Sequence, residues 1–470
     1  MSSRQPVAHL PSGAVRGTRD RFGERYRAIP YAAAPLGRGR FAAPAAHPGW
    51  TGVRDGTRPS PTAPQPSRDF GRLDLSPYFG PGWVRGDEYL TVDVRTPAAD
   101  GGQRPVMVFV HGGGFVTGST AAALYDGRAF ARDGVVLVTV NYRLGIPGFL
   151  VLDGAPDNRG LLDVLAALRW VRDAIGAFGG DPGNVTVFGQ SAGATLTAGL
   201  LATPEAKGLF RRAIVQSGSG TGAFTPEQAR RVTAAAAAAL GTEPTAEAFA
   251  AIPDDRLVAV TPALSGVDLR TATATDPLVG LSPFSLVLPV QPADAQGDDV
   301  ELLIGTTTEE GHLYLVPQGK FDGSTDADVL AVAAASRDDP EAAVAELRAA
   351  RPDASPGELR SALLGDALFG AGTARLIAAH APGPTYVYSF AHRSTALDGR
   401  LGAAHTVELP FVFDVADEPW LHGDTGLLGP GPAPAGLAAR VHRAWVGFAR
   451  TGDPGWAPHT PERPVVEVFR

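Results

Sequence analysis

The 470-residue sequence contains no cysteine. This absence excludes disulfide bonds, thiolate nucleophiles, and zinc or iron–sulfur sites built from cysteine ligands. The amino-terminal residues MSSRQPVAHL also lack the apolar stretch of a secretory signal peptide. A cysteine-free chain fits a reducing compartment, so we expect a cytoplasmic protein.

Long apolar runs and an excess of positive charge are missing as well. No run approaches the ~20 apolar residues of a membrane-spanning helix, and the longest simple apolar tract is Ala234–Leu240. Acidic residues outnumber basic ones, 49 to 41, which gives a net charge of −8. Binding to nucleic acid or to an anionic membrane needs a positive surface, so we expect neither partner.

The composition is that of a globular protein, with 44% hydrophobic and 19% charged residues. The 58 glycines and 41 prolines indicate many loops, but together they stay below the ~25–30% share that is typical of low-complexity chains. The sequence shows no internal repeat and no linker long enough to divide it. We therefore predict one domain over residues 1–470, with large insertions.

Short, almost wholly apolar segments predict strands that are covered on both faces. They are Val106–Val110, Val135–Val140, Val185–Phe188, Ala213–Gln216, Glu301–Gly305 and Thr385–Phe390. Helical patterns occur at Leu161–Phe178, Ala194–Leu201 and Glu227–Leu240. The alternation of strands and helices predicts an α/β fold. Pro59–Pro81 is expected to be an extended loop, and Asp322–Ser361 to be helical.

A candidate nucleophile lies in the segment Gly189-Gln190-Ser191-Ala192-Gly193, which matches the pattern G-x-S-x-G. A predicted strand precedes the segment and a predicted helix follows it. This is the setting of a nucleophile elbow, a tight turn that lifts the serine hydroxyl clear of the sheet. The alternative is a glycine-bracketed turn with no catalytic role. A serine nucleophile also needs a base and a group that stabilises the oxyanion.

The candidate oxyanion-stabilising group is the run His111-Gly112-Gly113-Gly114, directly after a predicted strand. Consecutive glycines let backbone N–H groups approach a developing oxyanion without side chains in the way. Together with the residue after the nucleophile, this predicts Gly113, Gly114 and Ala192 as the donors. Alone, the glycines could equally form a flexible turn or a phosphate loop, although the Lys-Ser/Thr that follows in a Walker loop is absent.

These motifs, in this order, closely resemble the type-B carboxylesterase family, which includes bacterial para-nitrobenzyl-type esterases and the cholinesterases. The resemblance spans nearly the whole chain. The other segments that carry it are Ala28–Ala34, Asn141–Leu150, Asp157–Asp163, Trp170–Gly193 and Trp445–Pro454. It implies an α/β-hydrolase fold, with a central, mostly parallel, twisted sheet, helices on both faces and large helical insertions.

The resemblance also implies the other members of a catalytic triad. The family's acid lies in a G-T-x-x-x-E-G segment, which here matches Glu310, with Glu309 as the adjacent competitor. The family's histidine precedes an E-x-P-F-V-F type segment, which matches His405. The chain order Ser191, Glu310, His405 agrees with that of α/β-hydrolases. Ser219 matches a family serine near the triad and is expected to support it, with an ordinary turn serine as the alternative.

Two further pairs of residues match positions that pair ionically in the family. They are Arg143 with Asp163, and Arg40 with Asp87. We interpret both pairs as structural.

We therefore predict a serine carboxylesterase that forms an acyl-enzyme on Ser191. We expect an uncharged or weakly polar ester as substrate, and Phe115, Phe284 and Phe411 as pocket residues because they flank the motifs. No cofactor or metal is implied. The alternatives are an acyltransferase or lyase that uses the same triad on a secondary metabolite, and a catalytically silent binding protein. The last would normally have lost a triad residue.

Overall fold

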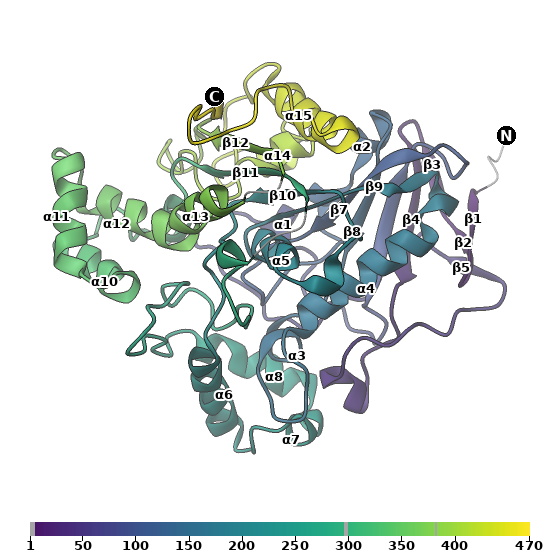
Figure 1. The fold of residues 1–470 in the computed structure, drawn as a ribbon, viewed down its shortest axis with the longest axis horizontal. Coiled ribbons are helices and arrows are strands. Elements are labelled where there is room, and N and C mark those ends of the chain that lie inside the picture. Colours follow the sequence, from purple (N-terminus) through teal and green to yellow (C-terminus); the bar gives the residue numbers. More distant parts are fainter. Residues whose placement is uncertain (1–4, 296–298, 381–382) are drawn as a thin grey trace.

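A twisted, mostly parallel sheet crosses the middle of the molecule (Figure 1). The computed structural model describes residues 5–295, 299–380 and 383–470. Within these residues the sheet has ten strands, in the order β13-β12-β11-β10-β9-β7-β8-β6-β4-β3. The strands from β8 across to β13 pair in parallel, whereas β3, β4 and β6 pair antiparallel. The predicted α/β-hydrolase fold is thereby confirmed.

The strands of the large sheet are β3 (Thr18–Asp20), β4 (Gly23–Pro30), β6 (Thr91–Thr96), β7 (Arg104–Val110), β8 (Val136–Val140), β9 (Gly180–Gln190), β10 (Arg212–Gln216), β11 (Glu301–Thr307), β12 (Thr385–Phe390) and β13 (Glu467–Phe469). A separate small sheet contains β1 (Val7–Leu10), β2 (Gly13–Arg16) and β5 (Val53–Asp55). Every strand predicted from an apolar segment is present. Because strands from both ends of the chain share the large sheet, we propose that residues 1–470 form one domain.

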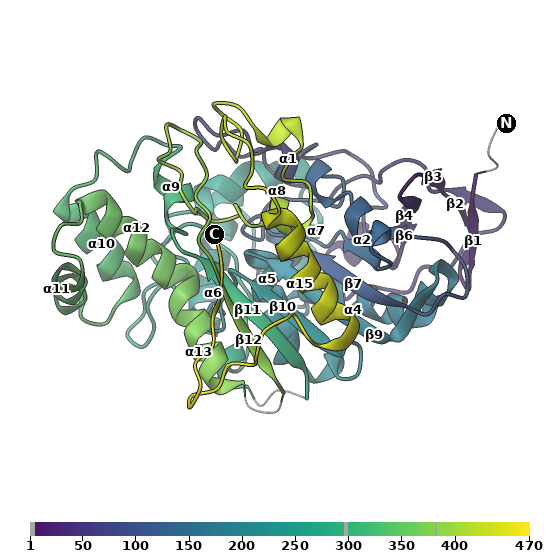
Figure 2. The same cartoon turned by 90° about the horizontal axis from the view of Figure 1, so that it is seen from above.

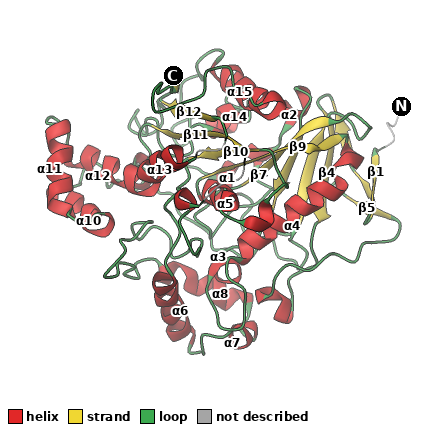
Figure 3. Cartoon of the chain, viewed as in Figure 1, coloured by secondary structure: helices red, strands yellow, loops and turns green. Residues whose placement is uncertain are grey.

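Helices cover both faces of the sheet, as the colours of Figure 3 show. The helices are α1 (Ser76–Phe79), α2 (Arg128–Arg132), α3 (Gly145–Phe149), α4 (Arg159–Ala174), α5 (Ala192–Leu201), α6 (Pro226–Leu240), α7 (Ala246–Ala250), α8 (Asp254–Val260), α9 (His312–Leu315), α10 (Asp326–Ser336), α11 (Pro340–Ala350), α12 (Pro356–Gly365), α13 (Ala371–Ala379), α14 (Leu409–Val412) and α15 (Leu437–Thr451). Most of the Pro59–Pro81 segment is loop, as predicted, but it contains α1.

Alternation of side chains along the strands produces two hydrophobic cores, one on each face of the sheet. In β9, Val185 and Val187 join the core that includes residues of α4 and α5. Phe188 points the other way and joins the core that includes residues of α2, α14 and α15. The parallel strands are therefore buried on both sides, which explains why their sequences read as unbroken apolar runs.

Helices α10, α11 and α12 project from one end of the molecule (Figure 1) and pack around a small core of their own that includes Val329 and Leu359. A π-helical turn, Asp366–Gly370, joins α12 to α13. Among the described residues, the continuous helical run Pro356–Ala379 is long and apolar enough to cross a membrane by length and composition alone. Core helices of soluble proteins meet the same criterion.

Of the two predicted ion pairs, the structure contains one. Arg143 and Asp163 form a fully buried pair with 2.7 Å between Nη2 and Oδ1. The prediction that Arg40 pairs with Asp87 was wrong, because Arg40 instead contacts Asp254 at 2.6 Å and backbone carbonyls at the end of α7.

Parallel strands end at the same edge of a sheet, and ligands in open α/β sheets bind at that edge. Here β7, β9, β10, β11 and β12 all point their carboxyl ends to one side. The segments that follow them contain every residue predicted for the triad and for the oxyanion-stabilising turn. Figure 2 shows these neighbouring strands from a second direction.

Candidate active site

Ser191 lies on a sharp turn between β9 and α5. Its backbone has φ 59° and ψ −127°, a combination that side-chain-bearing residues rarely adopt. Close packing explains the two flanking glycines: a Cβ on Gly189 would lie 2.3 Å from the carbonyl oxygen of Gly193, and one on Gly193 would lie 2.0 Å from that of Val110. This compact turn, with the serine at its apex, therefore permits only glycine at these two positions.

The glycine turn after β7 faces Ser191. Gly113 and Gly114 both have positive φ, at 114° and 63°. His111 fixes the start of the turn by stacking on Tyr142 with ring centroids 4.5 Å apart, and burial lowers the pKa of its imidazole to about 4. Within the described chain, the N–H groups of Gly113, Gly114 and Ala192 donate to no other protein group, which leaves them available to a ligand.

Glu310 and His405 come together as the sequence predicted. The Nδ1 of His405 lies 2.6 Å from Oε2 of Glu310, and both side chains are buried. The other oxygen of Glu310 accepts hydrogen bonds from the Ser217 hydroxyl at 2.6 Å and from the Thr307 N–H at 2.8 Å. These contacts fix the carboxylate, which in turn fixes the imidazole with its proton on Nδ1.

Glu309 points away from the histidine, although it is the adjacent residue. Its carboxylate pairs with Arg393 and accepts the N–H of Ala403 at 2.7 Å. Of the two glutamates that the sequence offered, the structure brings Glu310 to His405.

The second imidazole nitrogen, Nε2 of His405, accepts a hydrogen bond from the side-chain amide of Gln190 at 3.3 Å. Among the described residues, no hydrogen bond joins Nε2 to the Ser191 hydroxyl. Ser191 and His405 nonetheless line the same cavity. Catalytic hydrogen bonds are commonly long or misaligned before substrate binds and tighten in the complex.

Aromatic side chains hold the imidazole in place. Phe369, from the π-helical turn, stacks on His405 with centroids 4.3 Å apart and planes 8° apart. Tyr314 also stacks on the imidazole, with ring centroids 5.9 Å apart. Helical residues inserted between β11 and β12 therefore form one wall of the site.

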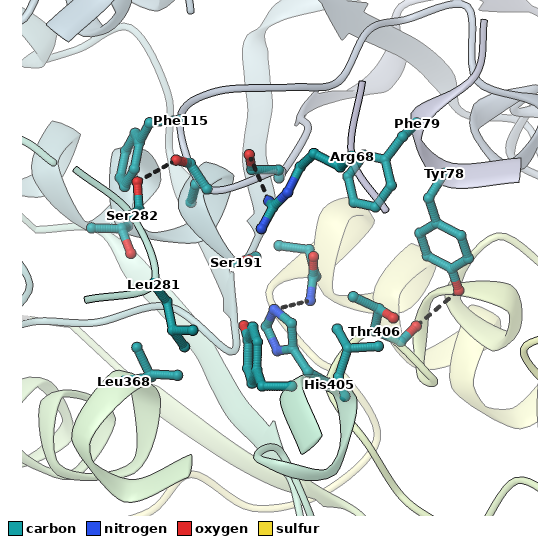
Figure 4. A pocket seen from close by; sticks show the side chains of 18 of the residues that line it. Arg68, Tyr78, Phe79, Phe115, Ser191, Leu281, Ser282, Leu368, His405 and Thr406 are labelled. Carbon is teal, nitrogen blue, oxygen red and sulfur yellow. Dashed lines mark hydrogen bonds between the residues drawn. The ribbon is translucent and has the colours of Figure 1, made fainter. Parts of the chain in front are cut away.

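Figure 4 shows the cavity that these residues enclose. Its volume is about 760 Å³, including its open mouth. Apart from Ser191, His405 and the glycine turn, its lining is mainly apolar. The side chains that line it include Arg68, Phe70, Tyr78, Phe79, Phe115, Tyr125, Thr195, Leu278, Leu281, Ser282, Leu313, Tyr314, Leu368, Phe369 and Thr406.

Some predicted site residues lie elsewhere. Phe115 lines the cavity, but Phe284 and Phe411 do not. Phe284 is buried in the core under α4 and α5, and Phe411 packs against Phe390 on the opposite face of the sheet. Proximity to a motif in sequence was the only basis for these two, and it does not determine where a side chain points.

The supporting serine is Ser217, not Ser219. Strand β10 ends at Gln216, so Ser217 is at the sheet edge and reaches Glu310. Two residues later the chain has turned, and the Ser219 hydroxyl accepts the N–H of Thr221 at 3.2 Å. The pattern Q-S-G-S could have suggested either serine. The contacts of Gln190 and Phe369 with His405 had no comparable signal in the sequence.

A second carboxyl group lies behind the triad. Glu408 is buried, and its Oε1 accepts only a long hydrogen bond, 3.4 Å, from Gln216. Within the described structure its Oε2 has no partner. Burial, together with the nearby charge of Glu310, raises the pKa of Glu408 to about 8. This carboxyl is therefore protonated at neutral pH.

Glu408 makes stability depend on pH in a predictable direction. Between about pH 4.5 and 8 the folded protein keeps a proton that the unfolded chain has lost, so the free energy of unfolding falls as pH rises. The loss should reach the order of 3 kcal/mol at pH 7. In Glu408→Gln this pH-dependent loss should be absent. The difference in the free energy of unfolding between the variant and wild type, measured by denaturant unfolding, should therefore favour the variant more at pH 8 than at pH 5. The exposed Glu462→Gln serves as control; a Glu408→Gln profile parallel to wild type would contradict the account.

Comparison with known proteins shows which family the chain resembles. The carboxylesterase family model matches residues 4–465. Phenmedipham hydrolase of Pseudarthrobacter oxydans is 37% identical over 459 residues, covering 96% of this chain and 91% of the relative. Para-nitrobenzyl esterase of Bacillus subtilis is 36% identical, covering 94% and 89%. A solved carboxylesterase of Geobacillus stearothermophilus superposes with a TM-score of 0.84 at 33% identity, covering 98% of this chain and 96% of that one.

The family match covers nearly the whole chain, and similar full-length relatives and structures are named esterases or hydrolases. The chain therefore belongs to the carboxylesterase family and is a carboxylic ester hydrolase of the α/β-hydrolase fold.

Proposed function

We propose that Ser191, His405 and Glu310 are the catalytic triad through which this enzyme hydrolyses small-molecule esters. The observation that carries the proposal is the 2.6 Å hydrogen bond from His405 to Glu310, in the wall of the cavity that also contains Ser191. A serine hydroxyl is a weak nucleophile until a positioned base accepts its proton. With Nδ1 protonated and held by Glu310, the Nε2 of His405 is the basic nitrogen.

In the first half-reaction, Ser191 Oγ attacks the ester carbonyl carbon and His405 accepts the hydroxyl proton on Nε2. The imidazole must first release its hydrogen bond with Gln190. Glu310 stabilises the imidazolium without taking its proton. The carbonyl oxygen becomes an oxyanion, which the N–H groups of Gly113, Gly114 and Ala192 bind. The oxyanion then re-forms the carbonyl, the bond from the carbonyl carbon to the alkoxide oxygen breaks, and His405 donates its Nε2 proton to that oxygen, so that an alcohol leaves.

In the second half-reaction, water attacks the acyl-enzyme with His405 as base, and the acid product leaves Ser191 free. An acyltransferase would use the same first half-reaction. In its second half-reaction, an alcohol would attack the acyl-enzyme in place of water. The names of the relatives, a hydrolase and an esterase, support water as the acceptor. No group beyond the side chains and backbone described above is needed for either step.

Replacing the nucleophile tests the proposal. Ser191→Ala should reduce kcat for a 4-nitrophenyl ester by about 10⁶-fold, as in other triad enzymes, because no group remains to form the acyl-enzyme. Ser219→Ala is the matched control, since that serine is also flanked by glycines, and it should stay within about threefold of wild type. Substantial activity in Ser191→Ala would contradict the triad.

The two adjacent glutamates give a second test. Glu310→Gln should lose roughly 10⁴-fold in kcat, because the imidazole is then free to adopt the wrong tautomer. Glu309→Gln should stay within roughly tenfold of wild type, because its carboxylate contacts Arg393 and not the histidine. Both variants are measured on one chromogenic ester. Equal losses in the two variants would mean that the acid acts through the local charge and not through its hydrogen bond.

A further inference from the structure

One permanent positive charge faces the active-site cavity. Arg68 lies in the long loop between β5 and β6, and Figure 4 shows its side chain reaching into the cavity from the same side as Phe79. The loop is tied to the glycine turn by Gln65, whose Oε1 accepts the Thr117 hydroxyl at 2.6 Å and the Gly118 N–H at 2.9 Å. The backbone of Arg68 is therefore only three residues from Gln65, which the glycine turn holds in place.

The guanidinium lies beside the residues that we propose bind the oxyanion. Its Nη1 donates a long hydrogen bond, 3.4 Å, to the carbonyl oxygen of Gly113. A Cβ added to Gly114 would lie 3.2 Å from the same nitrogen. The guanidinium carbon also lies 5.2 Å from the ring centre of Phe70, which in turn stacks on Phe79. A guanidinium has five N–H donors, and these contacts use one of them weakly.

No carboxylate in the described parts of the chain pairs with this charge. Among the described residues, Arg68 forms no ion pair, and none of the residues that line the cavity is Asp or Glu. The neighbouring Asp69 accepts the N–H of Gly71 instead. Desolvation by the surrounding protein lowers the pKa of the Arg68 guanidinium, although the side chain retains exposed surface. The enzyme thus holds an unpaired cation at the edge of an otherwise mainly apolar site.

Arginine is suited to bind a carboxylate, because its planar donor fork matches the two oxygens. We infer that the preferred substrates are esters that carry a free carboxylate, and that Arg68 is the residue that selects them. The inference rests on the proposed function and replaces the expectation of an uncharged substrate. A single guanidinium among aromatic and aliphatic side chains matches a monoanion on an apolar chain.

The test compares two substrates that differ only in charge. Mono-4-nitrophenyl adipate has a free carboxylate, and its methyl ester is neutral; both release 4-nitrophenolate. Wild type should have a kcat/KM at least 10-fold higher for the acid than for the methyl ester, the range expected for one charged hydrogen-bonded contact. Raising the NaCl concentration should shrink this preference, because the contact is partly exposed.

Arg68→Gln should abolish the preference, so that the ratio of kcat/KM for the acid to kcat/KM for the methyl ester falls to about one. Arg68→Lys, which keeps the charge but lacks the donor fork, should retain part of it. Arg72→Gln is the matched control: it removes the same charge from the same loop, and Arg72 is exposed and does not line the cavity. It should keep the wild-type ratio.

Two outcomes would overturn the inference. One is a wild-type enzyme that hydrolyses the neutral ester as well as the acid. The other is an Arg68→Gln enzyme that loses activity equally on both, which would mean that Arg68 only packs on Phe70 and supports the glycine turn. Either leaves the proposed function intact, because the neutral ester is still hydrolysed. Failure of wild type on both esters would instead contradict the proposed function.

Discussion

The turn at Ser191 is the constraint on which the rest of the site depends. It has no space for side chains at Gly189 or Gly193, because those positions touch the backbone of the turn itself and of β7. A residue held in such a conformation stores roughly 1–3 kcal/mol of strain and persists only when its surroundings enforce it. Here the enforcing contacts also fix β7, β9 and α5 relative to one another. The glycine turn that follows β7 is thereby held next to the serine.

Two buried glutamates behind this turn, Glu310 and Glu408, differ in the number of hydrogen bonds that they accept. Glu310 receives hydrogen bonds from His405, Ser217 and Thr307. Glu408 lies nearby with few partners, so its pKa rises. On the cavity side, the positive charge of Arg68 lies beside the glycine turn.

How much of this the sequence revealed depends on how local each feature is. The strands, the turn at Ser191 and the glycine turn depend on residues adjacent in sequence, and all were predicted. The meeting of Glu310 and His405 joins residues far apart in sequence, and only the resemblance to a family indicated it. Arg68 and Phe369 could not be predicted, because a loop and a π-helical turn carry them to the cavity, and neither has a periodic pattern. Phe284 and Phe411 show the opposite error, in which closeness in sequence was mistaken for closeness in space. Ser219 is a different error, because the match to a family serine selected the wrong serine of the Q-S-G-S segment.

The central claim is that Ser191 attacks the substrate while the backbone N–H groups of Gly113, Gly114 and Ala192 bind the oxyanion. The most direct measurement is a crystal structure of the enzyme after reaction with a 4-nitrophenyl alkylphosphonate, whose tetrahedral adduct resembles the reaction intermediate. The account predicts phosphorus bonded to Ser191 Oγ, a phosphonyl oxygen within about 3 Å of the three nitrogens, and His405 Nε2 turned from Gln190 toward the adduct. An adduct on another residue, or a phosphonyl oxygen directed away from the glycine turn, would contradict it.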